Sequence, residues 1–283
     1  MNQSIVKGSL LGIVAFFFMA LFGILTKIAL EDGSFIWVSF IAYLTATLIL
    51  SPYVITQGLP YLKSNHYGLL LGRAIFGTLA SFVYTVSIHY IPIVNSTLLF
   101  NTAPIFIPIL TVLFLHKSIA KNVWWAVLLG FIGIVIIIHP TTSIFSQTGN
   151  LLGLLSGISL AIAYLMMKIL TNTDPGVRII YYYLGIGTLL QLPFLYFYPM
   201  PPSHALFYAI ISGLSLVLAQ ITLVNAYRFA QASEIGVYQY TSIIFVGIFD
   251  WLIWNNVPPV WDMLGVILVT LAGILIIRNR VHD

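Results

Sequence analysis

Long runs of apolar residues alternate with short polar breaks along the whole chain. Ten such runs cover residues 8–29, 34–56, 67–88, 93–115, 122–139, 150–170, 178–198, 204–225, 235–254 and 260–277. Each is close to the ~20 residues that a helix needs to cross the hydrocarbon core of a bilayer. The breaks carry helix-ending or turn residues, among them Asp32-Gly33, Pro140 and Pro258-Pro259. The pattern therefore predicts ten transmembrane helices joined by connections too short for a soluble domain.

The composition agrees with this pattern. The chain is 60% hydrophobic and 6% charged, whereas roughly a quarter of the residues in a soluble domain are charged. An all-α integral membrane protein is therefore expected. No cysteine is present, and the six histidines do not share metal-ligand spacing, so neither a metal nor another cofactor is expected. The basic residues form no run, so a nucleic-acid partner is not expected either.

The first and sixth runs resemble each other. Residues 8–27 and 149–168 align without a gap at an offset of 141, with identities at Gly8/Gly149, Leu10/Leu151, Leu11/Leu152, Gly12/Gly153, Ala20/Ala161 and Lys27/Lys168. Further matches, such as Thr102/Thr241 and Phe106/Phe245, join the fourth and ninth runs at an offset of 139. The nearly constant offset predicts two copies of a five-helix unit, residues 1–140 and 141–283. Because five is odd, the two copies are expected to be inverted relative to each other.

The positions of Lys and Arg predict the orientation. With the N-terminus inside, the cytoplasmic side receives Lys7, Lys63, Lys117, Lys121, Lys168, Arg178, Arg228, Arg278 and Arg280, and only Lys27 falls toward the outside. An excess of Lys and Arg marks cytoplasmic loops. Both termini are therefore expected in the cytoplasm.

Several motifs carry a family resemblance. They are Arg73-x-x-x-Gly77, the segment 89–115 with Pro104, Gly130-x-x-Gly133, the segment 226–254, and Gly265 to Gly273. With them the chain resembles the drug/metabolite transporter superfamily, specifically proteins with two EamA-type domains. It departs from the family where His116-Lys117 and Asn255-Asn256 replace a Gly-Glu pair, and where Ile243 replaces a proline. The resemblance implies a carrier of small organic metabolites.

The fourth and ninth runs hold the densest set of polar residues at membrane depth, where such groups are functional candidates. The predicted substrate-binding residues are Asn95, Asn101, Thr102, Phe106, Gln220, Glu234, Tyr238, Tyr240 and Thr241. Polar faces meeting at the symmetry axis would line a central cavity. The alternative is hydrogen bonding between helices, which is common in membrane bundles.

Charged residues supply the other candidates. Glu234 and Asp250 are candidates for proton coupling, although a helix N-terminus equally favours an acid such as Glu234. Lys27, Arg73 and Lys168 are candidates for gating or interface contacts. For Arg73 the favoured interpretation is that its head reaches the cytoplasmic lipid phosphates, and the alternative is that it neutralises an anionic substrate.

Two further patterns have structural interpretations. The tyrosines 181–183 lie near a run's end and are typical of an interfacial aromatic belt. Glycines four residues apart predict close helix contacts: Gly8/Gly12, Gly68/Gly72 and Gly149/Gly153/Gly157.

The function expected from these observations is secondary transport by alternating access in a bacterial inner membrane. With few buried charges, a neutral or zwitterionic solute with an apolar part, such as an amino acid, fits better than a multiply charged anion. A lipid or lipid-linked sugar flippase of the same fold remains an alternative, and an intramembrane transferase is a weaker one. The expected partners are the small-molecule substrate and membrane lipid, and a monomer suffices because one chain holds both copies.

Overall fold

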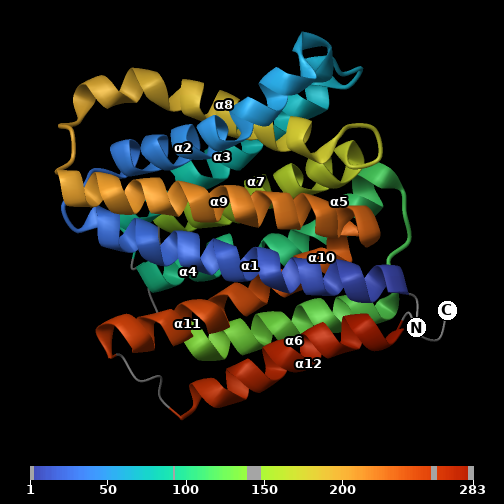
Figure 1. Ribbon diagram of the computed structural model, residues 1–283. Helices are drawn as coiled ribbons and strands as arrows, with labels where there is room; N and C mark the ends of the chain where they lie inside the picture. Colours follow the sequence, from blue (N-terminus) through green and yellow to red (C-terminus); the bar gives the residue numbers. More distant parts are fainter. Residues whose placement is uncertain (1–2, 92, 139–147, 256–259, 280–283) are drawn as a thin grey trace.

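The computed structural model describes residues 3–91, 93–138, 148–255 and 260–279, and within these ranges every regular element is a helix. In chain order they are α1 (Gln3–Leu30), α2 (Phe35–Gln57), η1 (Leu59–Leu62), α3 (Tyr67–Tyr90), α4 (Ile93–Phe100), α5 (Ala103–Leu115), α6 (Lys121–Ile138), α7 (Thr148–Leu170), α8 (Gly176–Gln191), η3 (Leu192–Phe197), α9 (Ser203–Phe229), α10 (Ala232–Val237), η4 (Tyr238–Tyr240), α11 (Thr241–Trp254) and α12 (Asp262–Asn279). The long helices lie roughly side by side (Figure 1). The start of α1 and the end of α12 lie at the same end of the molecule.

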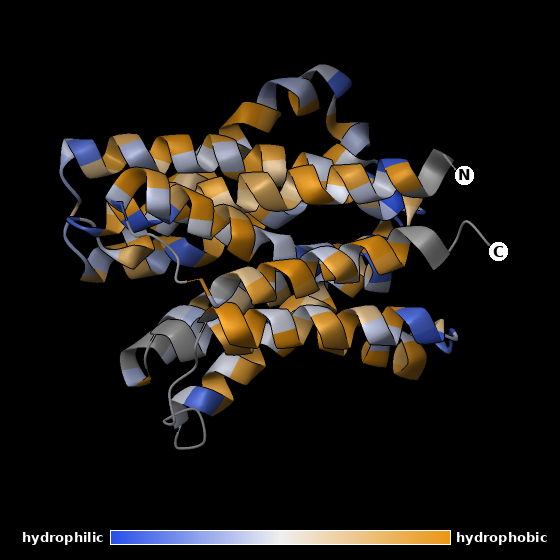
Figure 2. Ribbon diagram, turned by 90° about the horizontal axis from the view of Figure 1, so that it is seen from below, coloured by the Kyte–Doolittle hydropathy of each residue, from blue (hydrophilic) through white to orange (hydrophobic). Residues whose placement is uncertain are grey.

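The lengths and composition of the helices fit a bilayer. Within the described ranges, eight helical segments are long and apolar enough to cross a membrane. Two shorter apolar helices, Lys121–Ile137 and Met263–Ile276, coincide with the fifth and tenth predicted runs. Hydrophobic residues extend along the helices, and hydrophilic residues lie mainly toward their ends (Figure 2). The chain is therefore a multi-pass helical membrane protein.

Two of the predicted runs do not form continuous helices. The run 93–115 forms α4 and α5, which meet at Asn101 and Thr102, and the run 235–254 forms α10, η4 and α11. Pro104 explains the first break, because proline lacks a backbone N–H and its ring clashes with the carbonyl four residues earlier. The second break, at the 3-10 turn η4, has no proline. Predicting one uninterrupted helix over each run was therefore wrong at both places.

The glycines of α1 bring this helix close to the second half of the chain. A Cβ atom on Gly8 would lie 3.1 Å from Phe229 at the end of α9, and one on Gly12 would lie 3.3 Å from the ring of Tyr238. These contacts confirm the predicted close packing at both glycines. Gly68 behaves differently, because a Cβ atom there would meet open space.

Helix α7 makes the equivalent contacts with the first half. A Cβ atom on Gly149 would lie 2.7 Å from Tyr90 at the end of α3, and one on Gly153 would lie 2.8 Å from Leu99 in α4. Tyr90 and Leu99 each precede their counterparts on the α1 side by 139 positions. Each half therefore places its first helix on the third and fourth spans of the other half, as a duplicated unit would.

The ends of α5 and α11 are equivalent as well. His116 ends α5 with φ 50°, and Asn255 ends α11 with φ 56°. Glycine commonly occupies such a left-handed position after a helix, and asparagine tolerates it. Both residues stand where the family resemblance led us to expect the glycine of a Gly-Glu pair, so the backbone geometry persists although the glycine is absent.

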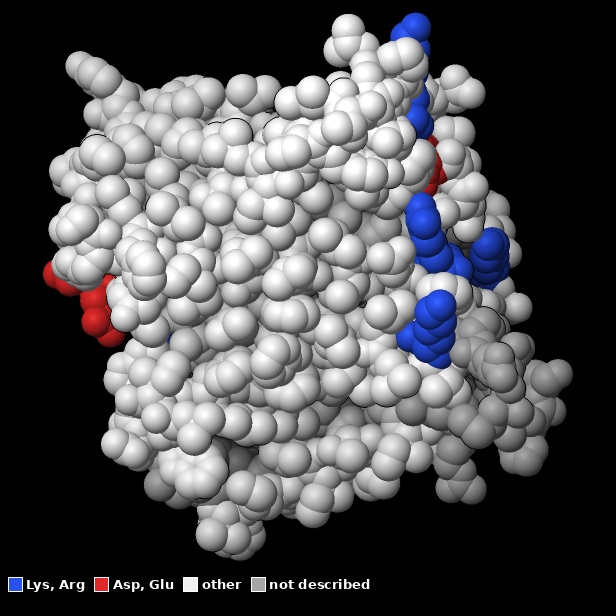
Figure 3. All heavy atoms as spheres, in the orientation of Figure 1, with Lys and Arg blue, Asp and Glu red and all other residues white. Residues whose placement is uncertain are grey.

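Charge is distributed unevenly between the two ends of the molecule. Most of the visible Lys and Arg side chains lie at the end that carries the start of α1 (Figure 3). The exposed Glu31 and Asp32 belong to the connection between α1 and α2, at the opposite end (Figure 1). Charge therefore distinguishes the two ends of the molecule.

Candidate functional site

Arg73 lies about two turns into α3, with only 2% of its surface exposed. Its Nη2 donates a hydrogen bond of 3.1 Å to Oε1 of Gln220 on α9, which is itself 1% exposed. The guanidinium carbon lies 4.0 Å from the ring centre of Tyr183 on α8 and 5.9 Å from that of Tyr164 on α7. The interpretation that Arg73 reaches toward lipid phosphates was therefore wrong. Its side chain turns inward because α7, α8 and α9 supply a polar and aromatic environment.

Tyrosine hydroxyls surround this guanidinium. The hydroxyls of Tyr43 on α2 and Tyr183 on α8 share a hydrogen bond of 2.6 Å, and the two rings pack edge to face. Tyr164 and Tyr227 have ring centres 6.0 Å apart. Tyr183 is 6% exposed, so its predicted place in an interfacial belt was wrong.

Several polar atoms in this region have no hydrogen-bond partner among the described residues. They are Nε and Nη1 of Arg73, Oγ1 of Thr78 and the hydroxyl of Tyr227. No carboxylate of the described part of the chain lies within 4.0 Å of Arg73 either. Buried polar groups are nearly always hydrogen-bonded, and buried charges are nearly always paired. The Arg73 cluster is therefore equipped to receive an acceptor that the described residues do not provide.

The breaks in the fourth and ninth spans lie against each other. Nε2 of Gln239 in η4 donates a hydrogen bond of 3.2 Å to Oδ1 of Asn101, between α4 and α5. Asn101 also donates from Nδ2 to the carbonyl of Thr97 at 2.9 Å, and Oε1 of Gln239 has no partner among the described residues. Both side chains are buried. The two halves thus meet through amide groups where each half interrupts a helix.

Other predicted substrate-binding residues face their own helices or other neighbours. Thr102 donates to the carbonyl of Leu99 at 2.5 Å, and Thr241 donates to that of Tyr238 at 2.6 Å. Phe106 is partly buried and packs against the hydrophobic core. Asn95 belongs to α4, but its side chain lies outside the described residues. Substrate contacts for these residues stay predictions.

Tyr238 and Tyr240 are both buried but point to different neighbours. The hydroxyl of Tyr238 donates to Ser9 of α1 at 2.8 Å and contacts the carbonyl of Gly273 of α12 at 3.3 Å. The ring of Tyr240 packs so closely on α6 that a Cβ atom on Gly130 would lie 2.2 Å from it. The structure therefore does not bring these two hydroxyls to one point.

Glu234 caps the start of α10. Its Oε2 accepts a hydrogen bond of 2.9 Å from the backbone N–H of Gln231, and the Gln231 side chain accepts from the backbone N–H of Glu234, which makes a capping box. The residue is 4% exposed. The geometry thus supports the helix-capping alternative for Glu234, whereas its part in proton coupling stays a prediction.

Lys27 and Asp250 form an ion pair at the end of the molecule opposite the basic end. Nζ of Lys27 on α1 lies 2.9 Å from Oδ1 of Asp250 on α11, and 4.0 Å from the ring centre of Trp254. The counterpart Lys168 on α7 donates to the backbone carbonyl of Tyr227 on α9. Lys27 therefore joins α1 to α11, and Lys168 joins α7 to α9. Each lysine lies on the first helix of its own half, and both partner helices belong to the second half.

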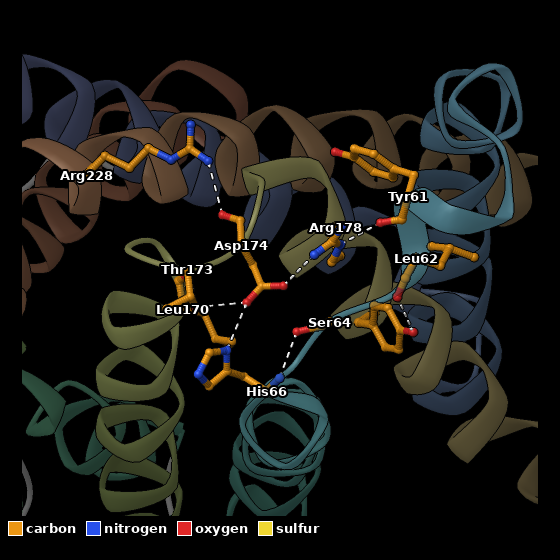
Figure 4. Close-up of polar contacts among 10 residues, drawn as sticks. Tyr61, Leu62, Ser64, His66, Leu170, Thr173, Asp174, Arg178 and Arg228 are labelled. Carbon is orange, nitrogen blue, oxygen red and sulfur yellow. Dashed lines mark hydrogen bonds and ion pairs between the residues drawn. The ribbon is translucent and has the colours of Figure 1, made fainter.

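A second polar cluster, which the sequence did not predict, lies in the connections at the basic end (Figure 4). Asp174 accepts hydrogen bonds from Nη1 of Arg178 at 2.8 Å and from Thr173 at 2.9 Å, and Nδ1 of His66 lies 3.8 Å away. Arg178 also donates from Nε to the carbonyl of Tyr61 at 2.6 Å. The Asp174 cluster thus ties η1 to the turn between α7 and α8.

A hollow of about 200 Å³ adjoins the Asp174 cluster. Its lining residues include Tyr53 of α2, Tyr61 of η1, Gly176 of α8, and Asn225 and Arg228 of α9. The hollow is therefore bounded by segments of both halves. Aliphatic side chains such as Val177 and Ile180 complete its lining.

The sequence indicated Arg73 and Gln220 as separate candidates but did not predict the hydrogen bond between them. It gave no prediction for Tyr43, Tyr164 or the side chain of Asp174. The tyrosines carry a usable signal, since a phenolic hydroxyl at membrane depth requires a hydrogen-bond partner when buried. Asp174 lies in an Asp-Pro-Gly turn between two apolar runs. Its acidic side chain at a basic end, four residues before Arg178, is the pattern of an i,i+4 ion pair.

A helical membrane bundle built from two similar halves, with interrupted helices facing each other, has the architecture of a secondary transporter. The chain belongs to the EamA-like transporter family, which matches residues 6–139 and 147–278. It is therefore a member of the drug/metabolite transporter superfamily with two EamA regions, and the resemblance noted in the sequence is confirmed.

Several characterised relatives are similar over most of their length. The pseudopaline exporter CntI of Pseudomonas aeruginosa is 26% identical over 214 residues, 75% of each chain. An S-adenosylmethionine uptake transporter of Rickettsia bellii is 25% identical over 248 residues, 86% of this chain and 84% of the relative. A riboflavin transporter of Vibrio cholerae is 28% identical over 242 residues, 83% of this chain and 80% of the relative. A solved crystal structure superposes with a TM-score of 0.81 at 13% identity, covering 100% of both chains, and shows the fold alone.

Proposed function

We propose that this chain is a secondary transporter that moves a small organic metabolite, such as an amino acid or a related amphipathic compound, across a bacterial inner membrane. The observation that carries the proposal is the hydrogen bond between Asn101 and Gln239, which joins the interrupted helices of the two halves. Transporters bind solutes near the bilayer midplane, where discontinuous helices of two repeats meet. The relatives named above carry different solutes, so the family does not specify the metabolite.

The proposed topology has ten spans, arranged as inverted halves of residues 1–140 and 141–283 with both termini in the cytoplasm. Equivalent packing of α1 and α7 supports two copies, and an odd number of spans per copy inverts one relative to the other. The Lys- and Arg-rich end that carries the start of α1 supports the orientation. Rocking of one half against the other would expose the centre alternately to each side.

The test uses purified protein and a library of small organic metabolites. A substrate is expected to raise the melting temperature of the detergent-solubilised protein and to be transported saturably after reconstitution in liposomes. Asn101→Ala should weaken both effects, because the amide contact between the halves is lost. Flipping of a labelled lipid without transport of any metabolite would contradict the proposal and favour the flippase alternative.

The ion pair between Lys27 and Asp250 is proposed as an outer latch, which favours closure of α1 against α11. Phe17 of α1 packs on Phe245 and Phe249 of α11 beneath it, with ring centres 5.3 and 5.6 Å apart. Ser242 lies on the same face of α11, three residues before Phe245. Because the chain has no cysteine, Ser242→Cys gives a single reactive site behind the latch.

We expect Lys27→Gln to speed labelling of that cysteine by a membrane-impermeant maleimide. The lysine and aspartate side chains are 56% and 27% exposed, and exposed ion pairs contribute about 0.2–1 kcal/mol, so the gain should not exceed about fivefold. Asp250→Asn should have the same effect, and the exchange Lys27→Asp with Asp250→Lys should reverse it. Equal labelling of all four proteins would show that the pair does not hold the outer side closed.

A further inference from the structure

The guanidinium of Arg73 is the feature that the proposed fold and function leave unexplained. Transfer of an unpaired charge into a protein interior is costly even after relaxation. The stacking of Arg73 on Tyr183 at 4.0 Å returns only part of this cost. Among the described residues its hydrogen bond to Gln220 pairs the cation with a neutral amide. Neither contact offsets the burial, so the site is incomplete without an anion.

The surroundings indicate what kind of anion fits. Hydrogen bonds from a guanidinium to a carboxylate are charge-assisted, which makes them stronger than those to a neutral acceptor. In this protein Nε and Nη1 are donors without a partner among the described residues, while the face of the guanidinium is covered by Tyr183. The hydroxyl of Tyr227 is a further donor without a partner among the described residues. A carboxylate would receive hydrogen bonds from these groups.

The chain also keeps space for this guanidinium. Gly77 lies one turn after Arg73 on the same face of α3, and a Cβ atom there would lie 2.3 Å from Nη1 of Arg73 and 2.8 Å from the ring of Tyr183. Any side chain at position 77 would therefore displace the guanidinium or the tyrosine. This close fit explains why a glycine stands four residues after Arg73 in this protein.

The position of Arg73 connects it to the transport route. Its partners come from α7, α8 and α9 of the second half, whereas Arg73 and Tyr43 belong to the first half. An anion bound here would touch both halves at once. Rocking of the halves around such a site would open it to each side of the membrane in turn.

From these observations we propose that Arg73, with Gln220 and the surrounding tyrosine hydroxyls, binds the carboxylate of the transported solute. The proposal rests on the proposed transport function and specifies its substrate class: a solute with one carboxylate next to an apolar or aromatic part. A single arginine suits one carboxylate rather than a polyanion, and the tyrosine rings suit the apolar part.

The experiment measures the melting temperature of purified, detergent-solubilised protein in four probes: acetate, benzoate, acetamide and benzamide, each against chloride as the reference salt. Acetate and benzoate should stabilise the protein, benzoate more strongly, and the neutral amides should not. In Arg73→Gln the apparent affinity for benzoate should fall at least about tenfold, because charge-assisted hydrogen bonds are lost. Lys63→Gln, which removes an exposed cation, should respond as the wild type does.

The Arg73→Gln protein without any probe supplies a second measurement. If Arg73 is an anion-binding residue, its charge is uncompensated in the protein without ligand. Glutamine is neutral and can still donate to Gln220, so Arg73→Gln should melt at the same temperature as the wild type or higher. A lower melting temperature would assign Arg73 a structural role and overturn the proposal. Equal stabilisation by chloride and acetate, or by benzoate and benzamide, would overturn it as well.

The two proposals fail in different ways. Saturable transport of a metabolite that lacks a carboxylate, unaffected by Arg73→Gln, would overturn the carboxylate site and leave transport standing. Binding of benzoate at Arg73 without transport of any metabolite in liposomes would remove the transport function and retain the anion site.

Discussion

Gly133→Ala is expected to lower the melting temperature of the solubilised protein, although alanine is normally the better helix residue. A Cβ atom on Gly133 in α6 would lie 2.7 Å from the backbone carbonyl of Gly265 in α12, and one on Gly265 would lie 2.5 Å from that of Gly133. The obstacle in each case is backbone, so no side-chain rotation relieves it. The two helices must separate, and overpacking of this kind costs about 1–3 kcal/mol.

In a chain of this size each kcal/mol corresponds to roughly 2–4 °C. Gly265→Ala should have the same effect as Gly133→Ala, and the melting temperature can be followed by light scattering or intrinsic fluorescence at a fixed heating rate. The matched controls are Gly23→Ala in α1 and Gly247→Ala in α11, where an added Cβ atom meets nothing within 4 Å. Because alanine favours helix by about 1 kcal/mol over glycine, the controls should match or exceed the wild type. A similar fall in all four variants would refute the reciprocal contact.

Asp174→Asn is expected to destabilise the protein strongly at neutral pH. The carboxylate is 1% exposed and holds Arg178, whose side chain is 13% exposed. Removing one member of a buried ion pair costs about 3–5 kcal/mol, because the other charge is left uncompensated. The double variant Asp174→Asn with Arg178→Gln should recover part of the loss. Asp32→Asn is the matched control, since Asp32 and its partner His204 are 60% and 56% exposed and their pair contributes little.

Asp174→Asn should also remove a pH dependence of the melting temperature. Burial raises the pKa of the Asp174 carboxyl, but hydrogen bonds from Arg178, Ser64 and Thr173 outweigh burial and hold the pKa below its usual range. A depressed pKa in the folded state stabilises the protein above the unfolded pKa of about 3.9, and this contribution is lost as the pH falls through the folded pKa. The wild type should therefore melt above Asp174→Asn from about pH 5 to 8, and the difference should shrink as the pH falls below about 4. Melting curves that stay equally far apart at the lowest pH would contradict this role.

The boundaries of most spans were predictable from apolar length alone. The run 150–170 became α7 (Thr148–Leu170), and the run 67–88 became α3 (Tyr67–Tyr90). Each run must satisfy its backbone hydrogen bonds within itself, so an apolar segment of this length has few alternatives to a helix. The breaks at Asn101 and Tyr238 lie inside runs that are long enough to span, so apolar length alone did not reveal them. Pro104 was a local signal for one break, and nothing equivalent marks the other.

The direction in which a side chain points was harder to predict than its depth. In a soluble protein the polar face of a helix identifies its solvent side, but lipid and bundle interior are both apolar, so this signal fades. Arg73 was therefore expected to reach outward from α3 to the lipid phosphates, and Tyr183 was placed in an interfacial belt. Their burial against Gln220 and Tyr43 depends on how α2, α3, α8 and α9 pack together.

By itself the sequence determined that the chain is a helical membrane protein with an internal repeat, because apolar length, charge placement and a constant offset are properties of the chain in one dimension. Its motifs, such as Arg73-x-x-x-Gly77, also indicated the family, and the family match confirms this resemblance. Only the tertiary structure decided that Arg73 meets Gln220, that Lys27 meets Asp250, and that Gly133 meets Gly265. These pairs lie more than a hundred residues apart in the chain, and only the packing of the helices brings them within contact.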